Sequence, residues 1–152
     1  MIVLFFVAIV MINFRVESPH GKSGHEQSSG AATVHTLVSS EIQYKSAYGD
    51  YTPDLKALGG SADQCQKPTR AHACLVDEVV TNSSAANPKS AYYFTVNAGP
   101  SANTFIVWGI PLDSRYRVFC ATDDGMVRFS APGAGVASTS YAACKALPAI
   151  PN

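Results

Sequence analysis

Four cysteines are the residues of this chain whose type and spacing most directly predict chemistry. They are Cys65, Cys74, Cys120 and Cys144. None belongs to a Cys-x-x-Cys pair, which disfavours a zinc ribbon, a thioredoxin-like redox motif and haem attachment. An even set downstream of an apolar N-terminus favours two disulfides in an oxidising compartment, and free thiols are the alternative. Of the three possible pairings we favour Cys65 with Cys74 and Cys120 with Cys144, because each pair brackets a loop-rich stretch.

The histidines and carboxylates do not form the pattern of a metal site or an active site. The histidines, His20, His25, His35 and His72, include no His-x-x-x-His or His-Glu-x-x-His pair. Asp123-Asp124-Gly125 lacks the spaced ligands of a calcium loop and is better explained as a hairpin turn. No Gly-x-Ser-x-Gly elbow or glycine-rich phosphate loop occurs. We therefore expect no catalytic residue, no metal, no cofactor and no enzymatic activity.

Composition narrows the class of protein further. The chain has 152 residues, enough for one domain with an appendage. Lys and Arg together number 11, as do Asp and Glu, so the net charge is zero and nothing in that balance attracts nucleic acid. Charged residues make up 14% of the chain, well below the usual quarter. Such a composition is common in proteins that work outside the cytoplasm.

The middle of the chain predicts a connector followed by an amphipathic helix. Residues 17–30 are rich in Gly and Ser and have no apolar period, so we expect a flexible connector there. A helix is expected from about Ala31 to Tyr48, capped by Ser28 or Ser29 and ended by Gly49. Its apolar face consists of Val34, Leu37, Val38, Ile42 and Tyr48.

The second half of the chain predicts an antiparallel sheet. A helical turn is expected at 53–58, and residues 72–81 fit a short helix or a buried strand, with the helix favoured. Runs rich in aromatic and β-branched residues then predict three or four strands, with Trp108 in the core or on a sheet face. The runs are 91–98, 104–112, 116–122 and 126–130. The last two are joined by Asp124-Gly125, a strong hairpin signal. We expect Cys144 to fasten the tail back to this sheet.

The N-terminal residues are apolar without interruption. Residues 1–14 carry no charged side chain, but this run is shorter than the about 20 residues that a membrane-spanning helix needs. It also lacks the basic start and the small-residue cleavage site of a signal peptide. We predict that residues 1–16 form a hydrophobic helical stem. The stem residues proposed to insert into a membrane or to assemble are Ile2, Val3, Leu4, Phe5, Phe6, Val7, Ile9, Val10, Ile12 and Phe14.

These features resemble the type IV pilins. The start MIVLFFVAIVMI is similar to the pilin stem, and residues 31–60 resemble the second half of the long pilin helix and the following loop in small bacterial pilin-like proteins. Later segments, ACLVDEVV, AYYFTVNAG and FCATDDGMVRFS, resemble a short segment, a core strand and the closing hairpin of the same group. Each motif is weak alone, and the shared order and spacing carry the resemblance. The matching residues in 31–60 are Glu41, Tyr44, Tyr51, Asp54, Leu55, Leu58, Gly59 and Gly60.

Two features depart from the family pattern. Pilins carry a basic leader, a Gly and a Phe-Thr-Leu-Ile-Glu type sequence ahead of the stem, and this sequence contains none of them. We expect the recorded start to lie late, with the leader and roughly half a dozen mature residues missing, which would bring the stem near the length of a membrane span. Residues 17–30, where pilins continue the helix, are expected to break it.

The resemblance implies an α+β fold in which the stem precedes an amphipathic helix packed on a 3–4-stranded antiparallel sheet. Residues 31–152 would form the pilin-like head. The implied function is that of a non-enzymatic filament subunit, held in the bacterial inner membrane before assembly and exposed on the filament afterwards. Its partners would be further copies of itself and the pilus or secretion assembly machinery. The alternatives are a pseudopilin of a type II secretion system and a secreted or membrane-tethered binding domain.

Overall fold

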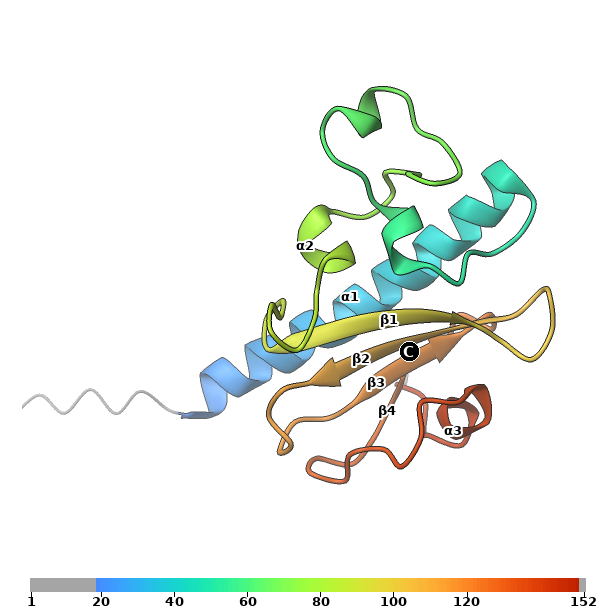
Figure 1. The fold of residues 1–152 in the computed structure, drawn as a ribbon. Coiled ribbons are helices and arrows are strands. Elements are labelled where there is room, and N and C mark those ends of the chain that lie inside the picture. The colour runs from blue at the N-terminus through green and yellow to red at the C-terminus, as the bar shows by residue number, and fades with distance from the viewer. Residues whose placement is uncertain (1–18, 151–152) are drawn as a thin grey trace, which may run out of the picture.

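The computed structural model describes residues 19–150, which form an α+β fold (Figure 1). A long helix, α1 (Pro19–Tyr48), packs against a four-stranded antiparallel sheet. Short helical segments lie between α1 and the sheet in the sequence, and another follows the sheet. The helix-on-sheet architecture predicted from the sequence is confirmed. The predicted stem, residues 1–16, lies outside the described residues.

The sheet is a meander whose strands are neighbours both in sequence and in space. The strands are β1 (Tyr92–Ala98), β2 (Phe105–Pro111), β3 (Phe119–Thr122) and β4 (Arg128–Phe129), in the order β1-β2-β3-β4. Each lies within one of the four predicted runs. The predicted hairpin is also confirmed: Gly125 has φ +76°, and its N–H donates to the carbonyl of Thr122 at 2.9 Å. Turn residues and a period of two therefore suffice to locate this sheet.

Helix α1 begins earlier than the sequence predicts. The prediction of a flexible connector is wrong for residues 19–30, because they belong to α1, which continues without a break to Tyr48. Neither proposed N-cap residue acts as one, since Ser28 and Ser29 both lie inside the helix. The predicted end of the helix is confirmed at Gly49, which has φ +92°.

Contacts with the sheet and its loops explain why a segment rich in glycine and serine is helical. Gly30 lets α1 approach the sheet closely: a Cβ at this position would lie 2.9 Å from the ring of Tyr92. Earlier in the helix, Glu26 accepts a hydrogen bond from the hydroxyl of Tyr116 at 2.6 Å. Such tertiary contacts override the low helix propensity of the local sequence.

Each face of the sheet has its own hydrophobic core. Residues of α1, including Val34 and Leu37, pack with the side chains of one face. The sheet residues of this first core are Tyr92, Phe94, Val96, Phe105, Val107, Phe119 and Ala121. The opposite face is covered by α3 (Tyr141–Lys145) and the segments around it. This second core consists of Ile106, Trp108, Val118, Cys120 and Cys144. Trp108 is fully buried, as the sequence predicts.

The segment between α1 and the sheet contains little regular structure. It includes two short 3-10 turns, η1 (Leu55–Leu58) and η2 (Gln64–Gln66), and a single helical turn, α2 (Glu78–Thr81). The predicted turn at 53–58 corresponds to η1, whereas the helix favoured over 72–81 is confirmed only for α2. Residues before α2 are extended along η1 instead, with the N–H groups of Leu75 and Val76 both donating to the carbonyl of Leu58.

Both disulfides have the favoured pairing. Cys65 and Cys74 are joined at an S–S distance of 2.00 Å, and Cys120 and Cys144 at 2.04 Å. The first closes a loop between η1 and α2, whereas the second joins β3 to α3. Two disulfides indicate a non-reducing environment, as in the periplasm or outside the cell.

Candidate assembly surface

The inner side of helix α1 is fixed by the sheet. Leu37 and Val34 have no exposed surface, and Gly109 of β2 leaves room for Val34, since a Cβ on Gly109 would lie 2.9 Å from the Cγ2 atom of Val34. Close approach of helix and strand removes apolar surface from water on both elements. Because this packing fixes the rotation of α1, it also determines which residues form the outer side.

The outer side of α1 carries no formal charge over the residues whose side chains the structure describes, 24–48. None of its exposed residues is Asp, Glu, Lys or Arg. Ile42 is the large apolar residue among them, with 51% of its surface exposed. The exposed residues, here called the outer face of α1, are Gly24, His25, Ser28, Ala32, His35, Thr36, Ile42, Gln43, Ser46 and Ala47.

Hydroxyl groups on and beside this outer face are bonded to the helix itself. Ser28, Thr36 and Ser39 each donate to the carbonyl four residues earlier, at distances of 2.9, 3.0 and 3.1 Å. A hydroxyl that already has a partner loses less on leaving water than an unpaired one. The outer face is therefore a surface without Asp, Glu, Lys or Arg that another uncharged surface could cover at low electrostatic cost.

The N-terminal end of α1 projects beyond the sheet (Figure 1). Contacts between this end and the rest of the fold include the bond from Tyr116 to Glu26 and a second from the backbone N–H of Arg117 to Gln27 at 3.2 Å. The Glu26 carboxylate, which accepts that hydrogen bond, raises the pKa of the Tyr116 phenol. These contacts hold the N-terminal part of α1 against the segment that precedes β3.

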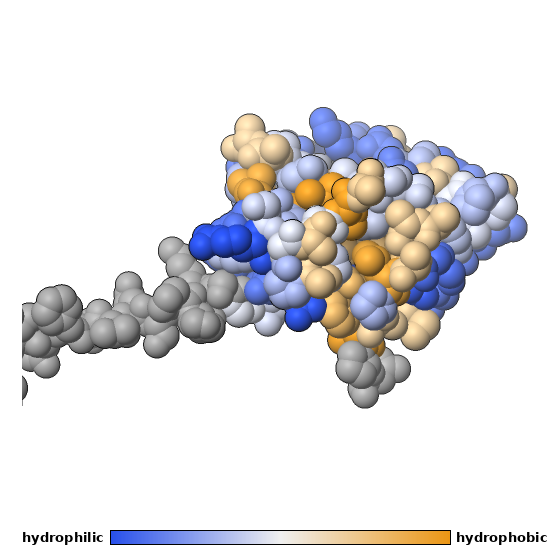
Figure 2. Space-filling view, turned by 90° about the horizontal axis from the view of Figure 1, so that it is seen from below, coloured by the Kyte–Doolittle hydropathy of each residue, from blue (hydrophilic) through white to orange (hydrophobic). Residues whose placement is uncertain are grey.

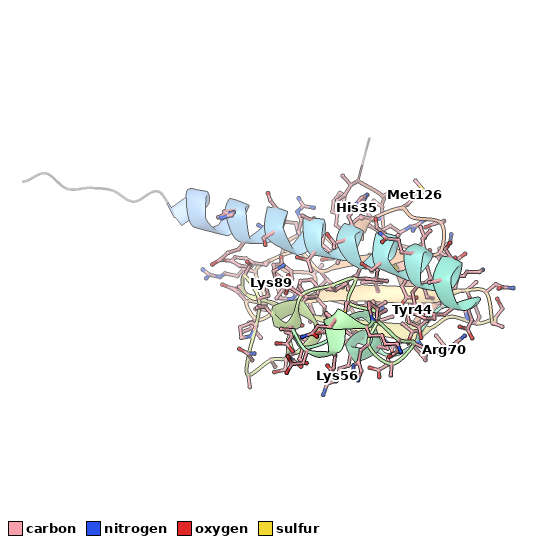
Figure 3. The ribbon with its side chains drawn as sticks, turned by 90° about the horizontal axis from the view of Figure 1, so that it is seen from above. His35, Tyr44, Lys56, Arg70, Lys89 and Met126 are labelled. Atoms are coloured by element: carbon pink, nitrogen blue, oxygen red, sulfur yellow. A yellow bond between two sulfur atoms is a disulfide. The ribbon has the colours of Figure 1, made fainter. Side chains whose placement is uncertain are left out.

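A groove lies next to the outer face of α1. It has a volume of about 430 Å³ and runs between α1 and the β3–β4 hairpin. Its apolar lining includes Met126 and Ile150, which are 48% and 39% exposed. Figure 3 labels His35 on α1 and Met126 on the neighbouring hairpin, on the same side of the molecule. Because His35 belongs both to the groove and to the outer face, the two surfaces are continuous.

Apolar side chains also gather on the face of the molecule seen from below (Figure 2). Separately, a shallow hollow of about 180 Å³ is lined by Arg117, Phe119, Phe129 and Ile150. The guanidinium of Arg117 lies 4.7 Å from the centre of the Phe129 ring. The side chain of Arg117 thus occupies one side of this hollow.

Acidic side chains near the groove between α1 and the β3–β4 hairpin accept hydrogen bonds. Asp124 accepts hydrogen bonds from Arg128 at 2.5 Å and from Lys145 at 2.7 Å. The hydrogen bond from Arg128, followed by that from Lys145, holds the pKa of this carboxyl far below its usual range. Tyr141 of α3 also donates to Asp123 at 2.8 Å. These bonds fasten α3 to the β3–β4 turn, so the acidic turn is a structural feature.

Within residues 19–150, no group of three or more His, Cys, Asp or Glu side chains is placed to hold a metal ion. The same stretch contains no helix long and apolar enough to cross a membrane. The predicted stem residues, 2–14, lie outside the described part of the chain, so their role stays a prediction. The expectations of no enzymatic activity and no cofactor also stay predictions.

Comparisons with protein-family models, with curated proteins and with solved structures found no match to this chain. The resemblance to type IV pilins therefore stays a prediction, and any function rests on the arrangement of the residues described above.

The outer face of α1 is the feature that the sequence analysis missed. A signal for it is present, because residues 27–40 contain no Asp, Glu, Lys or Arg. The predicted connector kept Gly24, His25 and Ser28 off the helix, and the prediction that Ile42 lies on the buried apolar face is wrong, because the structure exposes it. To predict the longer helix with its charge-free side, the close contact between Gly30 and the sheet would have to be known, and the local sequence does not reveal it.

Proposed function

We propose that the protein is the subunit of a type IV pilus-like filament. The observation that carries this proposal is the uncharged outer face of α1, on a helix that leads back toward the apolar residues 1–14. In this proposal the stem and the outer face of α1 contact other copies inside the filament. The sheet, the disulfide loops and α3 form the outer surface.

Physical reasoning supports such an assembly. Each large apolar side chain of the stem contributes about 1.5 to 3 kcal/mol when it leaves water, before the cost of ordering the chain is deducted. Lipid provides an apolar environment before assembly, and neighbouring stems provide one afterwards. A contact between two different surfaces of identical subunits that does not close into a ring produces a helical filament.

The proposal also assigns a location and partners. Before assembly, the stem would insert into the bacterial inner membrane, with the head in the periplasm. The two disulfides support a non-reducing location for the head. Partners would then be copies of the same chain and the machinery that extracts subunits from the membrane.

Deletion of residues 1–14 tests the role of the stem. We expect the full chain to form filaments visible by negative-stain electron microscopy, and the deleted chain to be a soluble folded monomer by light scattering and circular dichroism. A deleted chain that still polymerises would show that the stem is not the assembly element.

A charge introduced on the outer face of α1 tests whether this face contacts other copies in the filament. Ala32→Lys places an ammonium group at an exposed position of the outer face. We expect this variant to fold normally and to assemble at least tenfold less, because burying an unpaired charge between copies is costly. Ala62→Lys is the matched control, since Ala62 is exposed just before the loop that the Cys65–Cys74 disulfide closes, away from α1 in the sequence. Equal assembly by the two variants contradicts the proposal.

A further inference from the structure

A carboxyl group is buried at the C-terminal end of α1. Glu41 has no exposed surface, although it lies on a helix whose other end is in water. Its Oε2 atom accepts a hydrogen bond from the backbone N–H of Thr52 at 3.0 Å, whereas Oε1 has no partner. Among the described residues, no cation forms an ion pair with Glu41. The group is therefore held by a single bond to the loop that follows the helix.

The surroundings of Glu41 come from α1 and from this loop. Two phenols face the carboxyl, Tyr44 on the helix and Tyr51 on the loop. Tyr44 donates to the carbonyl of Arg70 at 2.9 Å, and Tyr51 packs on Phe105 with 4.6 Å between ring centres. Figure 3 shows Tyr44 and Arg70 together at this end of α1. The charged groups that lie beyond the two phenols are Lys45, Asp50, Arg70 and Asp123.

We propose that Glu41 is a proton-dependent latch: as the neutral acid it holds residues 49–54 closed over α1, and when it ionises the loop opens to water. Ionisation would open the loop because no cation in the described part of the chain is paired with the Glu41 carboxylate. A neutral carboxyl tolerates a dry site with one hydrogen bond, whereas a carboxylate without a cation does not. Gly49, with φ +92°, makes the chain reversal from which the loop would open. This inference does not depend on the proposed filament.

The latch would operate near neutral pH. Burial raises the pKa of Glu41 from 4.5 to about 7, although the hydrogen bond from Thr52 lowers it. When the loop is open, the pKa of the Glu41 carboxyl returns to its ordinary value. The closed state therefore binds more protons than the open state between these two values. Opening should become about tenfold more favourable for each pH unit in that window, and should level off above about pH 7. It would uncover the contact between Tyr51 and Phe105.

Amide hydrogen exchange of the full chain, kept monomeric in detergent micelles, tests the latch. We expect the protection factor of the Thr52 amide to fall about tenfold per pH unit between about pH 5 and 7. The amide of Val107, in the central strand β2, serves as the internal reference and should not follow this profile. Glu41→Gln preserves the shape of the side chain but cannot ionise, so its Thr52 protection should not vary with pH. An unchanged slope in that variant overturns the proposal.

A second measurement needs no variant. Carbon-13 NMR of the side-chain carboxyl in the wild-type chain reports the titration of Glu41 directly. A midpoint near 7 supports the latch, and a midpoint near the ordinary value of 4.5 overturns it.

Discussion

One face of the sheet packs against a single 30-residue helix, whereas the other is covered by a five-residue helix and irregular chain that a disulfide holds in place. On the first face, α1 contacts β1, β2 and β3. On the second, α3 contacts β2 and β3, and Cys144 of α3 is bonded to Cys120 of β3. The helix that covers the first face is held without a covalent link, whereas the segment that covers the second face is also joined to the sheet by a disulfide.

The amount of apolar surface explains this difference. The long helix buries several large side chains against the sheet, so the hydrophobic effect contributes strongly to holding it there. A helix as short as α3 is not stable in isolation and buries few side chains of its own. Its position depends on the disulfide and on the backbone bonds that pair the tail with β4, such as that from the N–H of Phe129 to the carbonyl of Pro148 at 3.1 Å. A cross-link therefore substitutes for packing area that the tail lacks.

Each face also leaves one buried polar atom without a partner in the described residues. Under the helix it is Oε1 of Glu41, and under the tail it is Nε1 of Trp108. The first belongs to a carboxyl group that changes its charge with pH, whereas the second belongs to an indole N–H group that does not titrate. Proton binding can therefore adjust the stability of the helix side through Glu41, whereas Trp108 gives the tail side no such response.

The largest expected effect is on the helix side of the sheet. Leu37→Ala removes a fully buried side chain from the core between α1 and the sheet. We expect a loss of about 4 kcal/mol in the free energy of unfolding, because the cavity cannot close without moving the helix. Urea denaturation monitored by circular dichroism measures this loss. Ile42→Ala, on the exposed side of the same helix, is the control and should cost under about 1 kcal/mol. Similar losses in both variants would mean that α1 does not hold the fold through its inner side.

The second effect is on the tail side. Replacing Cys120 and Cys144 with Ala opens a covalent loop with a sequence separation of 24 residues. We expect a loss of about 3 kcal/mol, and a tail that detaches while α1 and the sheet stay folded. Fluorescence of Trp108 and hydrogen exchange of α3 measure the detachment.

Replacing Cys65 and Cys74 with Ala is the matched comparison for that experiment. This disulfide has a sequence separation of 9 residues and closes a loop that contributes no residue to the second core, which contains Trp108. Its loss should leave the Trp108 signal unchanged. If both double variants altered Trp108 equally, the tail would not be held mainly by its own disulfide.

The sequence predicts the sheet and the disulfides better than it predicts the start of α1 or the short helix α3 in the tail. The strands, the Asp124-Gly125 hairpin and both disulfide pairings follow from alternation, turn residues and cysteine spacing, which are local signals. The start of α1 does not follow, because residues 19–30 become helical only through contacts with distant residues such as Tyr92 and Tyr116. The burial of Glu41 was missed for the same reason. Its partner, Thr52, comes close only after the chain reverses.

The smallest expected effect is a pH dependence of stability that runs in opposite directions on the two sides of the sheet. Glu41 has a raised pKa, so the helix side gains stability as pH falls from about 7 toward 4.5. Asp124 has a lowered pKa, chiefly through its hydrogen bond from Arg128, so its contribution to the tail side is present above the ordinary value of 3.8 and is lost as pH falls below it. Asp124→Asn should therefore cost about 1 to 2 kcal/mol near pH 7 and progressively less in acid.

Urea midpoints of the wild type and of Asp124→Asn, measured at neutral pH and near pH 3, check this expectation. Asp113→Asn is the control, because Asp113 pairs with Arg115 at 2.6 Å in an exposed turn and fastens no other element. Its midpoint should stay close to that of the wild type at both pH values. If Asp124→Asn behaves like this control, the disulfide alone holds the tail, and the network of Arg128 and Lys145 around Asp124 adds nothing to it. If Asp124→Asn instead has a lower midpoint than the wild type at neutral pH but not in acid, the charged Asp124 network and the disulfide together hold the tail, where little surface is packed.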